Sequence, residues 1–240
     1  MSLSARLRGF DSRLAEIQSH TFYAPALGPD SVVADLGAAS ADFSRQIVAR
    51  FGARCFAAEP LPENFALIQP HPRITALPVA LSGTDGRVAL GVRSGTMYGS
   101  ASFGRYDSLP EGERFEVDSV TLEGFRRLAG VERFDLVKVD IEGAEFPLFA
   151  AARDETLTSI GQITVEFHDF LDPALSPGVQ AIIRRLEGLG FMALRFTRHF
   201  HGDMLFLNRR HIDVGAAELL WFRHAVKTLR GVGRLIERVA

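Results

Sequence analysis

The sequence predicts an α/β fold in which a mostly parallel sheet carries helices on both faces. Apolar, β-branched runs end in acidic residues, and amphipathic segments at helical spacing alternate with them. The chain has 240 residues, of which 47% are hydrophobic, so one domain over residues 1–240 can enclose a sizeable core. No internal repeat or long linker divides it.

Composition narrows the class of protein. The formal net charge of −2 gives no general attraction to nucleic acid. The sequence contains no run of about 18 apolar residues, the length that would predict a membrane span. The one cysteine, Cys55, cannot form an internal disulfide, which agrees with a reducing compartment. The N-terminus lacks the basic and apolar regions of a signal peptide. We therefore expect a cytoplasmic protein without a nucleic-acid partner.

Residues 1–30 form a segment ahead of the first predicted strand. Hydrophobic side chains recur there at helical intervals and predict an N-terminal helix over residues 2–20; they are Leu3, Leu7, Phe10, Leu14 and Ile17. Pro25, Gly28 and Pro29 then break the chain.

Residues 31–51 predict a strand, a tight turn and a helix. Asp35 lies at the end of the strand, where its carboxylate can accept hydrogen bonds from a ligand. The turn does not match G-x-G-x-x-G, the dinucleotide fingerprint, and an acid there suits a cationic or zwitterionic ligand. An ordinary βα turn without a ligand is the alternative. Small residues let a ligand approach the turn and the N–H groups that open the helix; they are Gly37, Ala38, Ala39 and Ala41.

A second strand is predicted over residues 54–58 and ends in Glu59 and Pro60. Pro60 cannot donate a ladder hydrogen bond, so Glu59 lies at the edge of the sheet where α/β proteins bind ligands. A carboxylate there can accept both hydroxyls of a ribose, and a surface acid at a strand end is the alternative. A short helix over 61–69 and a strand over 74–81 follow.

Residues 87–118 predict an inserted strand pair joined by a glycine-rich loop over 94–100, because hydrophobic residues alternate with others on either side of it. Such a loop can contact substrate, although a surface connection is the commoner role. A helix is expected over 121–128.

The next strand, over residues 134–141, carries charges where a central parallel strand is normally apolar. Lys138 and Asp140 project from the same face by the period-two rule. A charge pair inside a sheet is costly unless it has partners. Glu142 and Glu145 follow directly, so acids gather at the end of this strand as well.

Glu166 and His168 form a second polar pair, at the end of the strand over 163–168. Together with Lys138 and Asp140 they can form one network at the edge of the sheet. His168 has an ordinary pKa near neutrality, which suits a general base. A structural ion-pair network is the alternative.

The remaining elements are expected in this order: a helix over 179–189, strands over 191–196 and 203–208, and a C-terminal helix within 211–240, mainly 216–238. The turn between the two strands contains Arg198, His199 and His201. Two histidines in a polar turn are more often exposed than bound to a metal, so we expect exposed side chains.

Several segments of the sequence, in the order in which they follow one another along the chain, resemble the FkbM family of S-adenosylmethionine-dependent methyltransferases. The matching segments are 33–38, 58–65, 79–86, 119–122, 135–145 and 165–168, and the strongest is DLVKVDIEGAE at 135–145. The resemblance covers roughly residues 31–210. It implies a class I methyltransferase, Rossmann-like fold: a seven-stranded, mostly parallel sheet with one antiparallel hairpin strand. It also implies methyl transfer, usually to a hydroxyl oxygen.

The resemblance implies a role for each candidate site residue by position. Those implied to bind the cofactor are Asp35, Gly37, Ala38 and Ser40 at its methionine end, Glu59 and Pro60 at its ribose, and Ala80, Leu81 and Ser82 at its adenine. Those implied to lie near the methyl donor and acceptor are Asp140 and Glu142, with Glu166 and His168 opposite. Ala39 and Ala41 stand where the family usually has Asn and Gly, so a polar contact is missing and the approach is narrower.

The implied reaction is an in-line displacement. The protein aligns an acceptor oxygen with the methyl–sulfur bond and removes its proton, with His168 or Asp140 as the base and Lys138 tuning Asp140. A divalent ion held by Asp140, Glu142 and Glu166 is compatible with these ligand types, but no spacing requires one. The acceptors suggested are small molecules or glycans: sugars, glycan precursors and polyketide-type natural products. The sequence predicts no oligomeric state.

Two rival functions remain open. A nicotinamide-dependent oxidoreductase shares the sheet and Glu59, but the later turn glycines and a catalytic Tyr-Lys or zinc set are missing from the sequence. A catalytically inactive methyltransferase-like binding module is the other rival, and Ala39 and Ala41 are the residues that favour it.

Overall fold

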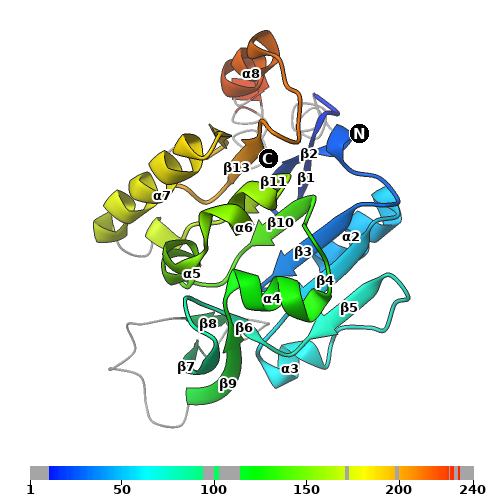
Figure 1. The fold of residues 1–240 in the computed structure, drawn as a ribbon, viewed down its shortest axis with the longest axis vertical. Coiled ribbons are helices and arrows are strands. Elements are labelled where there is room, and N and C mark those ends of the chain that lie inside the picture. The colour runs from blue at the N-terminus through cyan, green and yellow to red at the C-terminus, as the bar shows by residue number, and fades with distance from the viewer. Residues whose placement is uncertain are drawn as a thin grey trace.

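A seven-stranded sheet lies at the centre of the structure (Figure 1), a computed structural model that describes residues 11–93, 100–102, 114–170, 173–197, 200–226, 228–229 and 232. Its strands, in spatial order, are β12 (Phe191–Arg195), β13 (Met204–Asn208), β11 (Gln162–Val165), β10 (Leu136–Val139), β3 (Val32–Leu36), β4 (Arg54–Ala58) and β5 (Ile74–Leu77). Strands β11, β10, β3, β4 and β5 pair in parallel, and β13 runs antiparallel to both of its neighbours. The predicted mostly parallel sheet with one antiparallel hairpin strand is confirmed.

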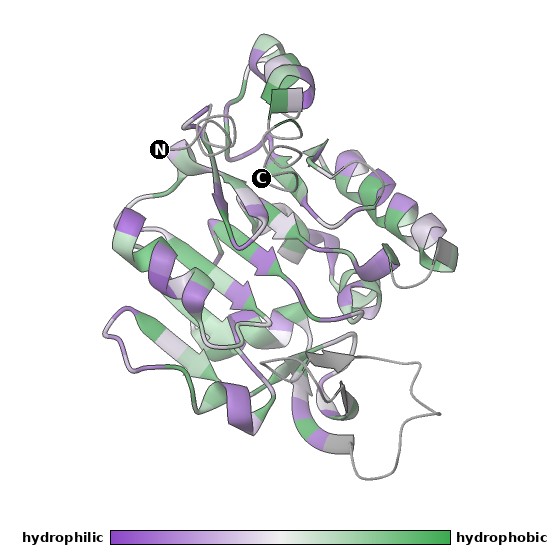
Figure 2. Ribbon diagram, turned by 180° about the vertical axis from the view of Figure 1, so that it is seen from behind, coloured by the Kyte–Doolittle hydropathy of each residue, from purple (hydrophilic) through white to green (hydrophobic). Residues whose placement is uncertain are grey.

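Helices cover both faces of this sheet. They are α2 (Asp42–Phe51), α3 (Pro62–Phe65), α4 (Leu122–Ala129), α5 (Glu145–Ala151), α6 (Asp154–Ser159), α7 (Ser176–Gly188) and α8 (Ala216–Trp221). Short helical turns are η1 (Ala24–Ala26), η3 (His168–Phe170), η4 (Pro173–Leu175) and η5 (Phe222–Val226). Helices α4, α5 and α6 lie in front of the sheet in Figure 1, and α2 lies on the face that Figure 2 turns toward the viewer.

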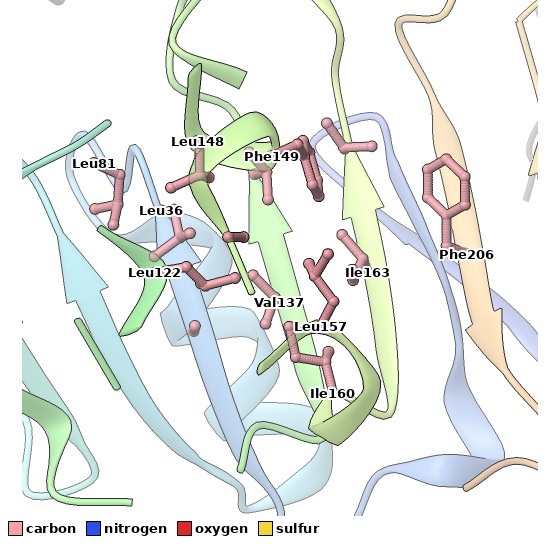
Figure 3. Packing of buried hydrophobic residues seen from close by; sticks show 14 of the residues in the cluster. Leu36, Leu81, Leu122, Val137, Leu148, Phe149, Leu157, Ile160, Ile163 and Phe206 are labelled. Atoms are coloured by element: carbon pink, nitrogen blue, oxygen red, sulfur yellow. The ribbon is translucent and has the colours of Figure 1, made fainter. Parts of the chain in front are cut away.

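The face under α4, α5 and α6 holds the largest cluster of buried hydrophobic side chains (Figure 3). Leu36, Val137 and Ile163 reach it from three adjacent strands, and Leu148 and Phe149 pack on them from α5. Burial of apolar area at about 25 cal/mol per Å² makes this face the main source of stability for the sheet. Because successive side chains of a strand point to opposite faces, the residues between these hydrophobic ones face the other side of the sheet.

The predicted N-terminal helix is wrong where the structure describes it. Residues 11–23 form a hairpin of β1 (Leu14–Ile17) and β2 (His20–Tyr23), while residues 2–10 lie outside the described part of the chain. Leu14 and Ile17 are three residues apart, so in a strand they face opposite ways. Leu14 packs with the β12–β13 cluster, whereas Ile17 packs with Val33 and Phe43 beneath α2. Each side chain therefore fills a different core.

The predicted strand over 74–81 is two strands in two sheets. Pro78 cannot donate a ladder hydrogen bond, so β5 ends at Leu77. The chain resumes as β6 (Ala80–Leu81) in a second sheet with the order β6-β9-β7-β8. Its other strands are β7 (Gly86–Arg93), β8 (Ser100–Ser102) and β9 (Arg114–Val120). Strands β7 and β9 are the expected inserted pair, and residues 94–99 of the expected loop lie outside the described part.

Three helices differ in extent from the prediction. Helix α3 covers Pro62–Phe65 rather than 61–69. Helix α7 starts at Ser176 rather than 179, and α8 passes at Phe222 into the π-helical turn η5. Phe222 and Val226 are buried against β12 and β13, and this packing holds the turn on the sheet. Most residues after 226 lie outside the description. Among the described helices, none combines the length and apolar character needed to cross a membrane.

Candidate active site

The candidate site residues meet at the carboxyl edge of the parallel strands. Register places Lys138 of β10 directly beside Asp35 of β3, and both strands end within the next few residues. Glu59 follows β4 and Glu166 follows β11. The sheet thus brings acids that are far apart in sequence to one edge.

Lys138 joins two of these strand ends. Its Nζ lies 3.2 Å from Asp35 Oδ1 and 3.6 Å from Asp140 Oδ2, and it donates a 2.6 Å hydrogen bond to the carbonyl oxygen of Gly37. Lys138 is only 3% exposed. Burial favours the neutral amine, but Asp35 and Asp140 outweigh it and raise the pKa of Lys138. The ammonium therefore stays charged and binds the turn after β3 to the end of β10.

Gly37 is fixed by close backbone packing. Its φ is 78°, and a Cβ added there would lie 1.7 Å from the carbonyl oxygen of Asp140. Glycine is therefore required where the turn after β3 crosses the end of β10.

Asp35 is completely buried and holds the start of α2. Its Oδ2 accepts hydrogen bonds from the Ser44 amide at 3.2 Å and the Ser44 hydroxyl at 2.7 Å. Its Oδ1 faces Lys138. The carboxylate therefore orders the turn that a ligand would approach, and its predicted contact with a ligand stays a prediction.

Glu59 is buried at the end of β4 and receives hydrogen bonds from both sides. Its Oε2 accepts from the Ala39 amide at 2.8 Å, and its Oε1 accepts from the Leu61 amide at 2.9 Å and from Asn64 Nδ2 at 3.4 Å. Desolvation raises the pKa of Glu59 despite these bonds. Pro60 follows it and ends the strand, as the sequence predicts. The carboxylate thus lies against the turn after β3.

The alanines of that turn adopt left-handed backbone conformations. Ala39 has a φ of 47° and Ala41 a φ of 59°. L-residues with a Cβ pay about 1–2 kcal/mol there, whereas glycine and asparagine adopt this region readily. This conformation gives a physical reason for asparagine and glycine at these positions in the family that the sequence resembles.

Replacing Ala39 with glycine is expected to raise the free energy of unfolding by about 0.5–1 kcal/mol, because the relieved backbone strain exceeds the added entropy of the unfolded chain. The matched control is Ala66→Gly, at an exposed alanine with a φ of −64°, which is expected to lose about 0.5–1 kcal/mol. Urea denaturation of the three proteins measures the difference. Equal losses in both variants would contradict the conformation at Ala39.

The other predicted cofactor residues are placed as follows. Ser40 donates a 2.9 Å hydrogen bond to Asp42, and the Ala38 amide donates to the Ala58 carbonyl at 2.9 Å. Ala80 and Leu81 are buried in β6 of the second sheet. Ser82 follows them and shares a 2.7 Å hydrogen bond with the Ser119 hydroxyl. This segment is held in place by its pairing with β9.

Asp140 lies between two histidine side chains. Its Oδ2 lies 3.4 Å from His20 Nε2, and its Oδ1 lies 3.9 Å from His168 Nε2. His20 comes from the N-terminal hairpin, is 1% exposed, and was missed by the sequence analysis. Burial lowers the pKa of His20, which favours the neutral ring. No local pattern marks His20, because only the folded hairpin brings it to the sheet edge.

His168 is held in orientation by Glu145, another site residue that the sequence analysis did not select. The Nδ1 of His168 lies 3.0 Å from Glu145 Oε1, and its Nε2 lies 3.3 Å from Glu142 Oε2. Glu145 is fully buried and accepts hydrogen bonds from the Ile141 and Gly143 amides. Burial alone would lower the pKa of His168, but Glu145, Glu142 and Asp140 raise it to about 9. The surroundings of Nε2 thus favour positive charge.

Glu166 completes the cluster on the side of β11. Burial and the neighbouring Asp140 charge raise its pKa to about 7. In the described part of the chain, two groups of side chains bring possible metal-ligand atoms within 4.8 Å of one another: His20, Asp140 and Glu166; and Asp140, Glu142 and His168. The expected network of Lys138, Asp140, Glu166 and His168 therefore exists, with His20 and Glu145 added.

His201 is buried, contrary to the expectation of an exposed side chain. Its Nδ1 lies 2.7 Å from Asp169 Oδ2, and its Nε2 lies 3.0 Å from Gln180 Nε2. These contacts tie the β12–β13 connection to η3 and α7. Arg198 and His199 lie outside the described residues.

Comparison with known proteins relates the chain to methyltransferases. A family model described as the methyltransferase FkbM domain matches residues 35–192. The 2-O-methyltransferase NoeI of Sinorhizobium fredii is 27% identical over 235 residues, which cover 88% of this chain and 95% of NoeI. The crystal structure of methyltransferase FkbM from Methylobacillus flagellatus matches with a TM-score of 0.50 at 15% identity, over 83% of this chain. The match spans 50% of that protein's length.

Proposed function

The chain belongs to the FkbM methyltransferase family, and from that premise we propose that it transfers a methyl group from S-adenosylmethionine to a hydroxyl oxygen of a sugar, glycan precursor or natural product. One observation carries the proposal: Glu59 at the end of β4 shares a sheet edge with the acidic and histidine cluster at the ends of β10 and β11. That edge is where open α/β sheets bind ligands.

The residues present fit the proposed cofactor in position and charge. The Glu59 carboxylate accepts a hydrogen bond from the Ala39 amide, and in the proposed complex it would accept hydrogen bonds from the ribose hydroxyls in its place. Asp140, Glu142 and Glu166 supply negative charge at the edge, which suits the sulfonium and ammonium of a cationic ligand. When bound, S-adenosylmethionine supplies a methyl group made electrophilic by its sulfonium.

We assign removal of the acceptor proton to Glu166. Asp140, named as a base from the sequence, is engaged by Lys138 and His20. His168, the other predicted base, is fixed by Glu145 and faces Glu142. Glu166 lies beside Asp140 at the end of β11 and faces the same edge. In this assignment His168 and Asp140 orient the acceptor, and Glu166 takes its proton.

An aromatic pair beside the cluster supports an acceptor with both apolar and hydroxylated surfaces. The Phe170 ring lies 5.3 Å from the His168 ring, and Phe200 packs edge-on against Phe170 at 6.2 Å. Phe170 is 39% exposed and Phe200 is 44% exposed. A sugar or other hydroxylated ring can place its apolar face on such aromatics while its hydroxyls reach the acids. The relative NoeI is named as a 2-O-methyltransferase, which favours an oxygen acceptor.

Thermal unfolding with added ligands tests the proposal. S-adenosylmethionine or S-adenosylhomocysteine at about 100 times its Kd is expected to add about 2.7 kcal/mol, a Tm rise of about 5–10 °C. The Glu59→Gln variant should lose most of that rise. Glu63→Gln, an exposed acid on α3, is the matched control and should keep it. A shift with NAD instead would favour the oxidoreductase, and no shift with any of these ligands would favour an inactive module.

A further inference from the structure

We propose that Asp140, Glu142 and His168 form a binding site for a divalent first-row transition-metal cation, for which Mn²⁺ is the probe. The three side chains come from the end of β10, the turn after it and the start of η3. The site stands on their geometry, and its use in catalysis rests on the function proposed above.

Distances between the ligand atoms fit a single ion. His168 Nε2 lies 3.3 Å from Glu142 Oε2 and 3.9 Å from Asp140 Oδ1, and all three side chains offer ligand atoms within 4.8 Å of one another. Nitrogen and oxygen ligands at about 2.0–2.2 Å from an ion are about 2.8–3.6 Å apart at right or tetrahedral angles. Small side-chain rotations are enough to reach that geometry.

The orientation of His168 is the second, independent observation. Its side chain is buried, and Glu145 lies 3.0 Å from Nδ1, so the Nδ1 proton has an acceptor. Nε2 then faces the oxygens of Glu142 and Asp140, where it holds a proton in the metal-free protein and where a cation can take the place of that proton. A histidine that ligates a metal through one nitrogen and bonds a carboxylate through the other is a recurring arrangement.

Glu145 has the position of the orienting carboxylate in such an arrangement. It is fully buried, and the amides of Ile141 and Gly143 hold its oxygens. These bonds fix the carboxylate and, through it, the plane of the His168 ring.

Asp140 divides its two oxygens between different partners. Oδ2 faces Lys138 at 3.6 Å and His20 at 3.4 Å, whereas Oδ1 faces His168. The Lys138 ammonium repels a cation near Oδ2. This repulsion favours the group with Glu142 and His168 over the group with His20 and Glu166.

Solvent access and ligand chemistry indicate the class of ion. The side chains of Asp140 and Glu142 are 28% and 36% exposed, so an ion can enter and keep positions for water or an acceptor hydroxyl. One imidazole with two carboxylates suits Mn²⁺, Fe²⁺, Co²⁺ or Zn²⁺ better than Ca²⁺. A hydroxyl bound to such an ion gives up its proton more readily.

Titration of the full chain with Mn²⁺ after chelator treatment, followed by electron paramagnetic resonance, tests the site. We expect saturable binding of one ion, weakened about 10–100-fold or more in His168→Gln and Glu142→Gln, and about 10–100-fold in Glu145→Gln. Glu142→Gln serves if the more buried His168 variant does not fold. The matched control is Glu187→Gln, an exposed acid on α7, which should bind as the unchanged protein does. Absorption of bound Co²⁺ in the visible range should change in the His168 variant.

The inference is overturned if Mn²⁺, Co²⁺ and Zn²⁺ show no saturable binding at millimolar concentration, or if binding survives in all three variants. Ligand-induced stabilisation by S-adenosylmethionine, measured with chelator present, keeps the two proposals separate. If S-adenosylmethionine stabilises the protein but no metal binds, the proposed cation site is wrong and the proposed function stands. If metal binds but S-adenosylmethionine neither stabilises the protein nor supports methyl transfer, the cation site stands and the proposed function is wrong.

Discussion

Replacing Lys138 with methionine is expected to lower the free energy of unfolding by about 3–5 kcal/mol. The change removes the ammonium that faces Asp35 and Asp140, and it also removes the donor to the Gly37 carbonyl. Asp35 is completely buried, so its carboxylate would remain charged without its cation or would have to take up a proton. Methionine keeps most of the side-chain volume, so the loss measures charge rather than packing.

Urea denaturation followed by circular dichroism measures this effect. The control is the double variant Lys138→Met with Asp35→Asn, in which the stranded charge is also removed. We expect the double variant to be more stable than Lys138→Met alone, because the two residues are in contact and their effects are not additive. A loss below about 1 kcal/mol in Lys138→Met would show that the ion pair does not hold the edge together.

Replacing Glu166 with glutamine is expected to lower kcat by about 10²–10⁴-fold, the range that positioned acid–base groups contribute. The substitution keeps the shape of the side chain and removes its ability to accept a proton. Affinity for S-adenosylmethionine should stay within about twofold, since Glu59 and the turn after β3 are proposed to hold that ligand. The expected signature is a fall in kcat with little change in ligand-induced stabilisation.

The measurement is methyl transfer to an acceptor found by screening hydroxylated sugars and natural products. Glu187→Gln, on the exposed surface of α7, is the control for a general effect of losing one carboxylate. A kcat within tenfold of the unchanged protein would contradict the assignment of Glu166. The proton would then go to another group at the edge, and the same test would be applied to His168.

Sequence patterns predicted the structure correctly where the local preference of a segment for strand, turn or helix agrees with its place in the tertiary structure. The apolar run before Asp35, the small residues after it and the amphipathic segment that follows do form β3, a turn and α2. The residues at the ends of β10 and β11 could also be recognised, because charges interrupt strands that are otherwise apolar. Parallel pairing then brings these strand ends to one edge.

Patterns failed where the deciding contact is distant in sequence. The turn of the N-terminal hairpin is Gln18-Ser19, with φ of 48° and 64°, and it contains none of the glycine or asparagine that normally marks such a turn. Leu14 and Ile17 fit a helical spacing equally well. Packing of Ile17 and Phe22 beneath α2 selects the hairpin, and that selection places His20 beside Asp140.

By itself, then, the sequence determined most of the order of strands and helices after residue 30, the acids at the strand ends and the resemblance to one family, because these depend on periodicity and residue type along the chain. Only the tertiary structure decided which charges meet. The Asp35 side chain points inward to Ser44 and Lys138. Asp140, Glu142 and His168 face one another, and the contact of Glu145 with His168 Nδ1 orients the ring. Direction and burial of a side chain depend on the neighbouring strands, and these are set by packing of the whole sheet.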